Sequence, residues 1–224
     1  PGIPDDDNRD YLPEYLKDSE IVVNENGNNS QVYPKRLEEK KGALVDEFVD
    51  TWYQYVPESY NPEKKTPIVF SMHGGLMTGW AQAVYTSWTH IADREGFICI
   101  FPNAQLRRFW TIECEDKLYK ELSAPNEEGI YMNPVPPIEE NHDVLVVFAL
   151  IEKLKKEYNI DEERIYMQGM SCGNAMTTMM ARHFGNKFAA MEGSAGPGTM
   201  GLMFREDGTT NNLSLIHISE PTRH

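Results

Sequence analysis

The chain has 224 residues, of which 40% are hydrophobic and 11% aromatic, so it is long and apolar enough for one globular domain. Its formal net charge of −14 argues against a nucleic-acid partner or an anionic membrane, because phosphate groups would repel such a surface. No stretch approaches the roughly 18 apolar residues that a membrane helix needs. The three cysteines, Cys99, Cys114 and Cys172, are odd in number and match no zinc pattern, so neither a metal nor a cofactor is expected.

Both ends of the chain are expected to lie outside the folded domain. Residues 1–45 are interpreted as a lead-in that opens with proline, glycine and a run of aspartates. At the other end, residues 213–223 read LSLIHISEPTR, which resembles the translated product of a transposon-type sequencing adapter. Residues 213–224 are therefore treated as a non-native tail, the alternative being a natural polar tail. We expect a partial domain over 46–212, and a natural protein that continues past it.

The first half of this domain predicts buried strands separated by a helix. Alternating residues over 51–56 favour one strand of a hairpin. The nearly continuous apolar runs at 68–72 and 97–101 are typical of strands buried on both faces of a sheet. Between them, apolar residues at helical spacing from Gly79 predict one helix that Gly96 ends.

The second half alternates regularly between helix and strand. An amphipathic helix is predicted over 143–158 and a second helix over 173–184. Strands are predicted over 164–168 and 188–193. This alternation indicates an α/β fold with a mostly parallel sheet and helices on both faces.

A connection of about forty residues, 103–142, lacks clear periodicity, which is long for a compact domain. It is therefore either functional or contains an element that the pattern hides. Its aromatic residues Trp110, Tyr119 and Tyr131 could form a wall over a site for a phenolic acyl group or a polymer chain. The alternative is that they simply pack the long connection against the domain.

The segment Gly169-Met170-Ser171-Cys172-Gly173 is a G-x-S-x-G motif between a predicted strand and a predicted helix. This context is typical of the nucleophile elbow, a sharp turn that exposes a serine hydroxyl at the top of a sheet. Glycines are needed on either side because side chains there would collide with the neighbouring strand and helix. Ser171 is therefore the candidate nucleophile, and the alternative is a glycine-rich turn in which Ser171 only caps the helix.

An acyl-transfer enzyme also needs N–H groups to hold the negative oxygen of its tetrahedral intermediate. One donor is expected from Cys172, directly after the nucleophile. A second is expected from the segment His73-Gly74-Gly75-Leu76, which follows the apolar strand at 68–72. Gly74 and Gly75 are the candidates we name, although Leu76 also qualifies and a simple glycine turn is the alternative.

Three segments, IVFSMHGG, IADREGFICIFPN and NHDVLVVFALIEKLKKEYNIDEERIYMQGMSCGNAMTTMMA, resemble the poly(3-hydroxybutyrate) depolymerase and feruloyl esterase group of α/β hydrolases. The resemblance covers residues 50–197 and is strongest from Asp143 onward. It implies a secreted or periplasmic carboxylic ester hydrolase that acts on polyesters or on acyl groups of plant polysaccharide. The chain opens with Pro1 rather than Met, so the missing signal peptide says nothing about export.

The fold orders its triad as serine, then acid, then histidine, and no convincing acid or histidine follows Ser171. The acids after it that we considered are Glu192, Glu206 and Asp207. The histidines after it are His183, His217 and His224, and those before it are His73, His90 and His142, of which only His142 is kept as a rearranged base. The domain is thus expected to be incomplete at its C-terminal side and nearly inactive on p-nitrophenyl acetate.

Two other functions remain open from the sequence. A prolyl-oligopeptidase-like serine peptidase shares the same fold and elbow, and would be separated by its activity on peptide rather than ester substrates. The other is a non-catalytic α/β-hydrolase-fold domain that binds a ligand or partner. A complete gene without Asp and His at the expected strand ends would favour it, and labelling of Ser171 by a fluorophosphonate in the full-length protein would count against it.

Overall fold

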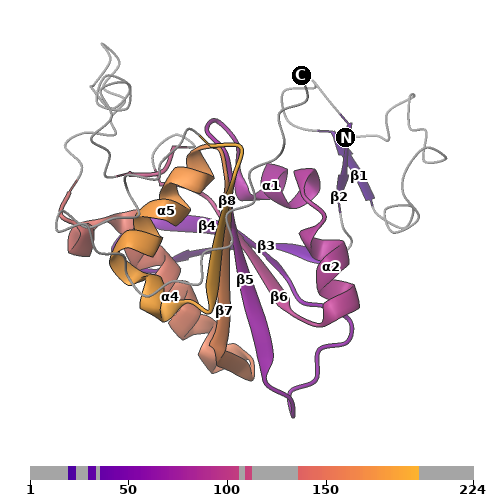
Figure 1. The fold of residues 1–224 in the computed structure, drawn as a ribbon. Helices are drawn as coiled ribbons and strands as arrows, with labels where there is room; N and C mark the ends of the chain where they lie inside the picture. Colours follow the sequence, from indigo (N-terminus) through magenta and orange to yellow (C-terminus); the bar gives the residue numbers. More distant parts are fainter. Residues whose placement is uncertain (1–19, 24–29, 34–35, 106–108, 113–135, 197–224) are drawn as a thin grey trace, which may run out of the picture.

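The computed structural model describes residues 20–23, 30–33, 36–105, 109–112 and 136–196. Within them, six strands form one mixed sheet with the order β3-β4-β6-β5-β7-β8 (Figure 1). These strands are β3 (Leu37–Ala43), β4 (Val49–Tyr55), β5 (Thr66–Met72), β6 (Ile98–Pro102), β7 (Ile160–Met170) and β8 (Ala190–Ser194). A separate antiparallel pair consists of β1 (Glu20–Val23) and β2 (Ser30–Tyr33).

Helices cover both faces of the sheet, as predicted. In Figure 1, α4 and α5 lie on one face and α1 and α2 on the other. The α-helices are α1 (Gly79–Tyr85), α2 (Trp88–Glu95), α4 (His142–Glu157) and α5 (Cys172–Phe184), and single 3₁₀ turns are η3 (Ile138–Glu140) and η4 (Gly185–Lys187). None of the helices in the described ranges is long and apolar enough to cross a bilayer.

Strand direction places the ends of three strands together. Strands β6, β5, β7 and β8 run parallel, whereas β4 is antiparallel to β6 and β3 is antiparallel to β4. The sheet is therefore mostly parallel, and the α/β prediction is confirmed. Because parallel strands end at the same edge, the segments that follow β5, β7 and β8 meet at one edge of the sheet.

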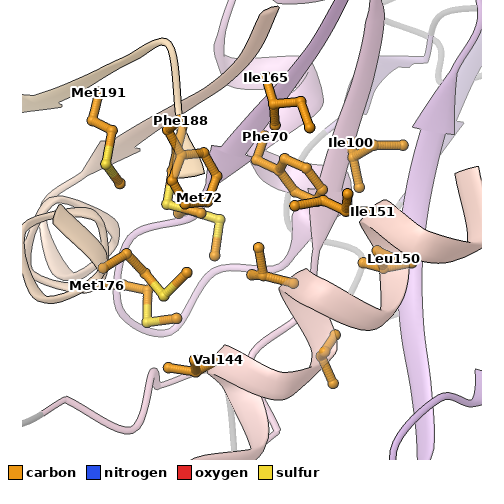
Figure 2. Packing of buried hydrophobic residues seen from close by; sticks show 14 of the residues in the cluster. Phe70, Met72, Ile100, Val144, Leu150, Ile151, Ile165, Met176, Phe188 and Met191 are labelled. Atoms are coloured by element: carbon orange, nitrogen blue, oxygen red, sulfur yellow. The ribbon is translucent and has the colours of Figure 1, made fainter. Parts of the chain in front are cut away.

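The core is divided by the sheet into two layers, which explains the continuous apolar strands. Figure 2 shows one layer, where Phe70 and Met72 of β5 pack against Met176 of α5 and Ile151 of α4. Val69, from the same strand, lies in the other layer with residues of α1, α2 and β6. A strand covered on both faces needs apolar side chains at consecutive positions rather than at alternate ones.

Two expectations differ from the structure. The helix predicted from Gly79 to Gly96 is two helices, because Thr86 takes an extended conformation and its hydroxyl donates to the Gln82 carbonyl, which ends α1. The lead-in predicted over 1–45 contains β3, so the described sheet begins at Leu37. This edge strand has the sequence LEEKKGA and buries only Leu37, so no alternating apolar pattern marks it.

Candidate active site

Ser171 lies on the turn between β7 and α5, at the sheet edge described above. Its backbone has φ 55° and ψ −117°, a conformation that residues with a side chain rarely adopt. The turn is fixed to the neighbouring strand because the Ser171 N–H donates to the Ser194 carbonyl at 3.0 Å. The Ser171 side chain is not fully buried. The structure thus places the serine on a strained strand-to-helix bend, the backbone geometry that the motif predicted.

The two glycines that flank Ser171 are required by close backbone contacts. A Cβ added at Gly169 would lie 1.9 Å from the Gly173 carbonyl oxygen, in the first turn of α5. A Cβ added at Gly173 would lie 2.1 Å from the carbonyl oxygen of Met72, at the end of β5. The predicted reason for these glycines, collision with the adjacent helix and strand, is therefore confirmed.

The loop that follows β5 lies directly against the serine turn. A Cβ added at Gly74 would be 3.5 Å from the Ser171 Cβ, and one added at Gly75 would be 3.0 Å from the Cys172 Sγ. Cys172 is the first residue of α5, where backbone N–H groups have no partner inside the helix. The structure therefore brings together the serine and the glycine pair that were separated by 95 residues of sequence.

His73 anchors this loop and is a structural residue. Its side chain is fully buried. The Ala104 N–H donates to Nε2 of the ring at 3.0 Å, so the ring proton resides on Nδ1, which lies 2.7 Å from the Gly74 carbonyl oxygen. The Trp110 indole N–H donates to the His73 carbonyl at 2.7 Å, and the two rings lie 4.6 Å apart. Both ring nitrogens of His73 are thus engaged in shaping the loop.

A buried carboxylate holds the described part of the long connection in place. Asp143 accepts hydrogen bonds from the Gln105 N–H at 2.9 Å and the Thr111 N–H at 2.7 Å. Burial raises the pKa of Asp143, although these backbone N–H groups oppose the shift. Asn141, which caps α4 by accepting from the Val144 N–H, also donates to the Thr111 carbonyl at 2.7 Å. The segment without periodicity is therefore ordered here by side chains at the start of α4.

The aromatic residues of this connection divide into two groups. Trp110 is buried, so for this residue the packing alternative holds. Tyr119 and Tyr131 lie outside the described residues. Sequence reasoning missed Phe109, whose ring would lie 2.8 Å from a Cβ added at Gly75 and which therefore borders the loop. An aromatic residue next to a buried tryptophan gave no periodic signal that could have identified it.

The acid and histidine candidates within the described residues do not lie beside Ser171. His142 is buried between two carboxylates, with Nδ1 3.2 Å from Asp46 and Nε2 2.7 Å from Asp50, so both ring nitrogens are occupied. His183 lies in the last turn of α5, roughly 18 Å along the helix from Ser171 at 1.5 Å per residue. Glu192 lies within β8 and lines a groove on the α2 side of the sheet. The remaining positions are His90 on α2, and Glu206, Asp207, His217 and His224 outside the described residues.

Backbone strain among the described residues gathers at this same edge. The residues other than glycine with positive φ there are Leu76 at 61°, Ser171 at 55° and Ala195 at 50°. They follow β5, β7 and β8, respectively, at the carboxyl ends of three neighbouring strands. Such conformations cost about 1–3 kcal/mol each and concentrate at functional sites, which favours this edge as the site of chemistry.

Comparison with known proteins also finds similarity to esterases. No family model matches the chain. It is 29% identical over 147 residues to a bifunctional acetylxylan esterase/xylanase of Neocallimastix patriciarum, a match that covers 66% of this chain and 18% of that protein. It is 26% identical over 141 residues to feruloyl esterase B of Neurospora crassa, with coverage of 62% and 41%. Poly(3-hydroxyalkanoate) depolymerase C of Paucimonas lemoignei is 23% identical over 146 residues, with coverage of 64% and 30%.

The chain spans less than half the length of these curated relatives. Among solved structures, a thermostable esterase superposes with a TM-score of 0.50 at 22% identity, covering 80% of this chain and 48% of that one. This likeness shows the fold alone. The chain is thus similar in sequence to an acetylxylan esterase, a feruloyl esterase and a poly(3-hydroxyalkanoate) depolymerase, and similar in fold to an esterase.

Proposed function

We propose that this chain carries the nucleophile and the oxyanion site of a serine carboxylic ester hydrolase. The observation that carries the proposal is the strained turn at Ser171, with the Gly74–Gly75 segment packed against it. The relatives, which are esterases by name, support ester rather than peptide bonds as the target.

In the proposed reaction the Ser171 hydroxyl attacks the acyl carbon of the ester while a base takes its proton. The carbonyl oxygen becomes negative, and the N–H of Cys172 with an N–H of the Gly74–Gly75 segment stabilises it. The alcohol leaves with the proton, and an acyl group remains on Ser171. Water then attacks the acyl group by the same steps in reverse and releases the acid.

We propose that the acid and the base of the reaction come from residues outside the described ranges. Support for this comes from His142 and His183, which are committed elsewhere or lie too far along α5. The non-native tail over 213–224 and the end of the partial domain at residue 212 remain predictions from the sequence. The relatives' names also support acyl esters of xylan or of a polyester as substrates, and such polymers would be met outside the cell.

Fluorophosphonate labelling followed by peptide mass spectrometry tests this function. The reagent needs only one attack by the serine, so we expect slow labelling confined to Ser171 and abolished by Ser171→Ala. Ser59→Ala, at an exposed serine on the loop after β4, is the matched control and should label normally. A folded chain that is never labelled at Ser171, or that is labelled equally after Ser171→Ala, would contradict the proposal.

A substrate panel separates the proposed function from the peptidase. p-Nitrophenyl acetate, methyl ferulate, acetylated xylan and a poly(3-hydroxybutyrate) suspension are compared with a prolyl peptide amide. Turnover of any ester that Ser171→Ala removes, without cleavage of the peptide, supports the esterase and identifies the acyl group. Robust turnover by this chain would also show that its base lies within the 224 residues.

A further inference from the structure

Beneath the serine turn, the α1 and α2 side of the sheet holds a cluster of buried polar side chains. The Ser71 hydroxyl donates to the Gln168 Oε1 at 2.8 Å, and the Trp88 indole N–H donates to the same oxygen at 3.1 Å. The Gln82 amide donates to the Ser71 hydroxyl at 3.0 Å, and the Gln168 amide donates to the Ser194 hydroxyl at 3.4 Å. Ser71 and Gln82 are fully buried and Gln168 nearly so.

These side chains are unusual for their position in the sheet. Ser71 and Gln168 are direct register partners on β5 and β7, two central parallel strands whose neighbouring positions are apolar. Polar groups at such positions are costly unless they are hydrogen-bonded, and an apolar pair would fill the space without that requirement. The bonds that Ser71 and Gln168 make do, however, restrict the two strands to one arrangement, whereas the Gln82 Oε1 has no hydrogen-bond partner among the described residues.

The network joins the strands that carry the two halves of the candidate active site. Ser71 lies two residues before His73, and Gln168 lies three residues before Ser171. Ser194, which accepts from the Gln168 amide through its hydroxyl, accepts from the Ser171 N–H through its carbonyl. One side chain, Gln168, is thus bonded to the strand before the glycine loop and to the residue that holds the serine turn.

We propose that Gln168 is a positioning residue for the ester hydrolysis proposed above. Through Ser71 and Ser194 it fixes the separation between Ser171 and the Gly74–Gly75 segment. Gln168 touches no reacting atom; it acts on the spacing between the nucleophile and the donors to the negative oxygen. This inference rests on the proposed function for its chemical consequence, but the geometric part can be measured independently.

The variant Gln168→Met keeps the volume of the side chain and removes its hydrogen bonds. Gln54→Met is the matched control, because Gln54 is another buried glutamine of the same sheet, on β4, bonded to Tyr158 and Trp52 rather than to the site. Both variants lose buried hydrogen bonds, so both are expected to be less stable than the parent chain. Only Gln168→Met should change the spacing between Ser171 and the Gly74–Gly75 segment.

Two readouts on the full chain decide the question. The first is the rate of Ser171 labelling by a fluorophosphonate, which we expect to fall roughly ten-fold or more in Gln168→Met and to stay within about two-fold in Gln54→Met, because small misplacements of reacting groups are costly. The second is amide hydrogen exchange in peptides spanning 73–77 and 171–175, which should become faster in Gln168→Met only.

The outcomes separate the two proposals. If the parent chain is not labelled at Ser171, the proposed function fails, and hydrogen exchange alone still tests the positioning by Gln168. Equal exchange of both peptides in the parent chain and in Gln168→Met would overturn the inference. The same holds if Gln54→Met slows labelling as much as Gln168→Met, because the effect would then follow stability rather than position.

Discussion

The two halves of the candidate active site are held by different means. The turn at Ser171 is fixed by close backbone packing, because Gly169 and Gly173 allow contacts within the turn and with β5 that a residue with a Cβ would not permit. The loop at Gly74 is held from a distance, by bonds from Ala104 and Trp110 to His73. The glycines of the first half can therefore be recognised as a sequence motif, whereas the residues that hold the second half are marked by no motif.

This difference predicts unequal sensitivity to substitution. Where two backbone segments are in close contact, no side chain can rotate away to make room. One added methyl group must therefore move a strand or a helix. A hydrogen-bonded loop loses one interaction at a time and retains the others. Substitutions at the serine turn should thus alter stability most. Substitutions at the residues that hold the glycine loop should alter it less, and substitutions at the surface of that loop least.

The largest effect is expected from Gly173→Ala. Its Cβ would lie 2.1 Å from the Met72 carbonyl oxygen and 2.7 Å from that of His73, so α5 and β5 must separate. We expect the free energy of unfolding to fall by about 3 kcal/mol or more, measured by urea denaturation. Gly42→Ala, where the added Cβ would lie 3.8 Å from the Trp52 ring, should change it by less than about 1 kcal/mol. Similar losses in both variants would refute steric control of the turn by Gly173.

An intermediate effect is expected from Asp143→Asn, which tests the distant support of the loop. The amide can accept from only one of the Gln105 and Thr111 N–H groups, so we expect a loss of about 1–3 kcal/mol at pH 7. Burial raises the pKa of Asp143, so the folded state binds the proton more readily than the unfolded state does. The contribution of Asp143 to the free energy of unfolding therefore rises as the pH falls from the pKa of the folded state towards the pKa of the unfolded state.

The sign of this pH dependence can be checked against a second aspartate. The gap in stability between the parent chain and Asp143→Asn should widen as urea unfolding is repeated from pH 7 towards pH 4.5. Asp161 is the control, because its hydrogen bond with Arg164 lowers its pKa, so the gap to Asp161→Asn should stay nearly constant over the same range and narrow only below the unfolded aspartate pKa of about 3.9. A narrowing gap for Asp143→Asn would mean that its carboxylate is stabilised rather than penalised by its surroundings.

Sequence patterns were sufficient to predict those elements and residues that a periodicity or a motif marks within one segment of the chain. The helices predicted over 143–158 and 173–184 correspond to α4 and α5, and the glycines around Ser171 have the predicted steric role. The edge strand β3 was hidden because its charged side chains face solvent and do not alternate with apolar ones. The break between α1 and α2 was hidden because a threonine at the end of a helix resembles one inside it.

The support of the glycine loop could not be predicted for a related reason. Asn141 caps α4, whereas Asp143, two residues later, reaches the connection at Gln105 and Thr111. Asparagine and aspartate are both common at the start of a helix. Only the folded chain shows which backbone groups each of these two side chains can reach. The Ser71–Gln168 pair was likewise invisible, because register between two strands is set by the whole sheet.

The smallest effect is expected at the surface of the glycine loop, from Leu76→Gly. Leu76 has φ 61° and is 67% exposed, so glycine relieves a left-handed conformation that costs about 1–2 kcal/mol while losing little burial. The greater freedom of glycine in the unfolded chain offsets about 0.5–1 kcal/mol of this, so a net gain of less than about 1 kcal/mol is expected in thermal unfolding. Val49→Gly, at another exposed apolar residue on β4 without positive φ, should instead be destabilising. If both variants lose stability equally, contacts rather than backbone conformation hold Leu76, and the left-handed conformation adds no measurable strain to the loop.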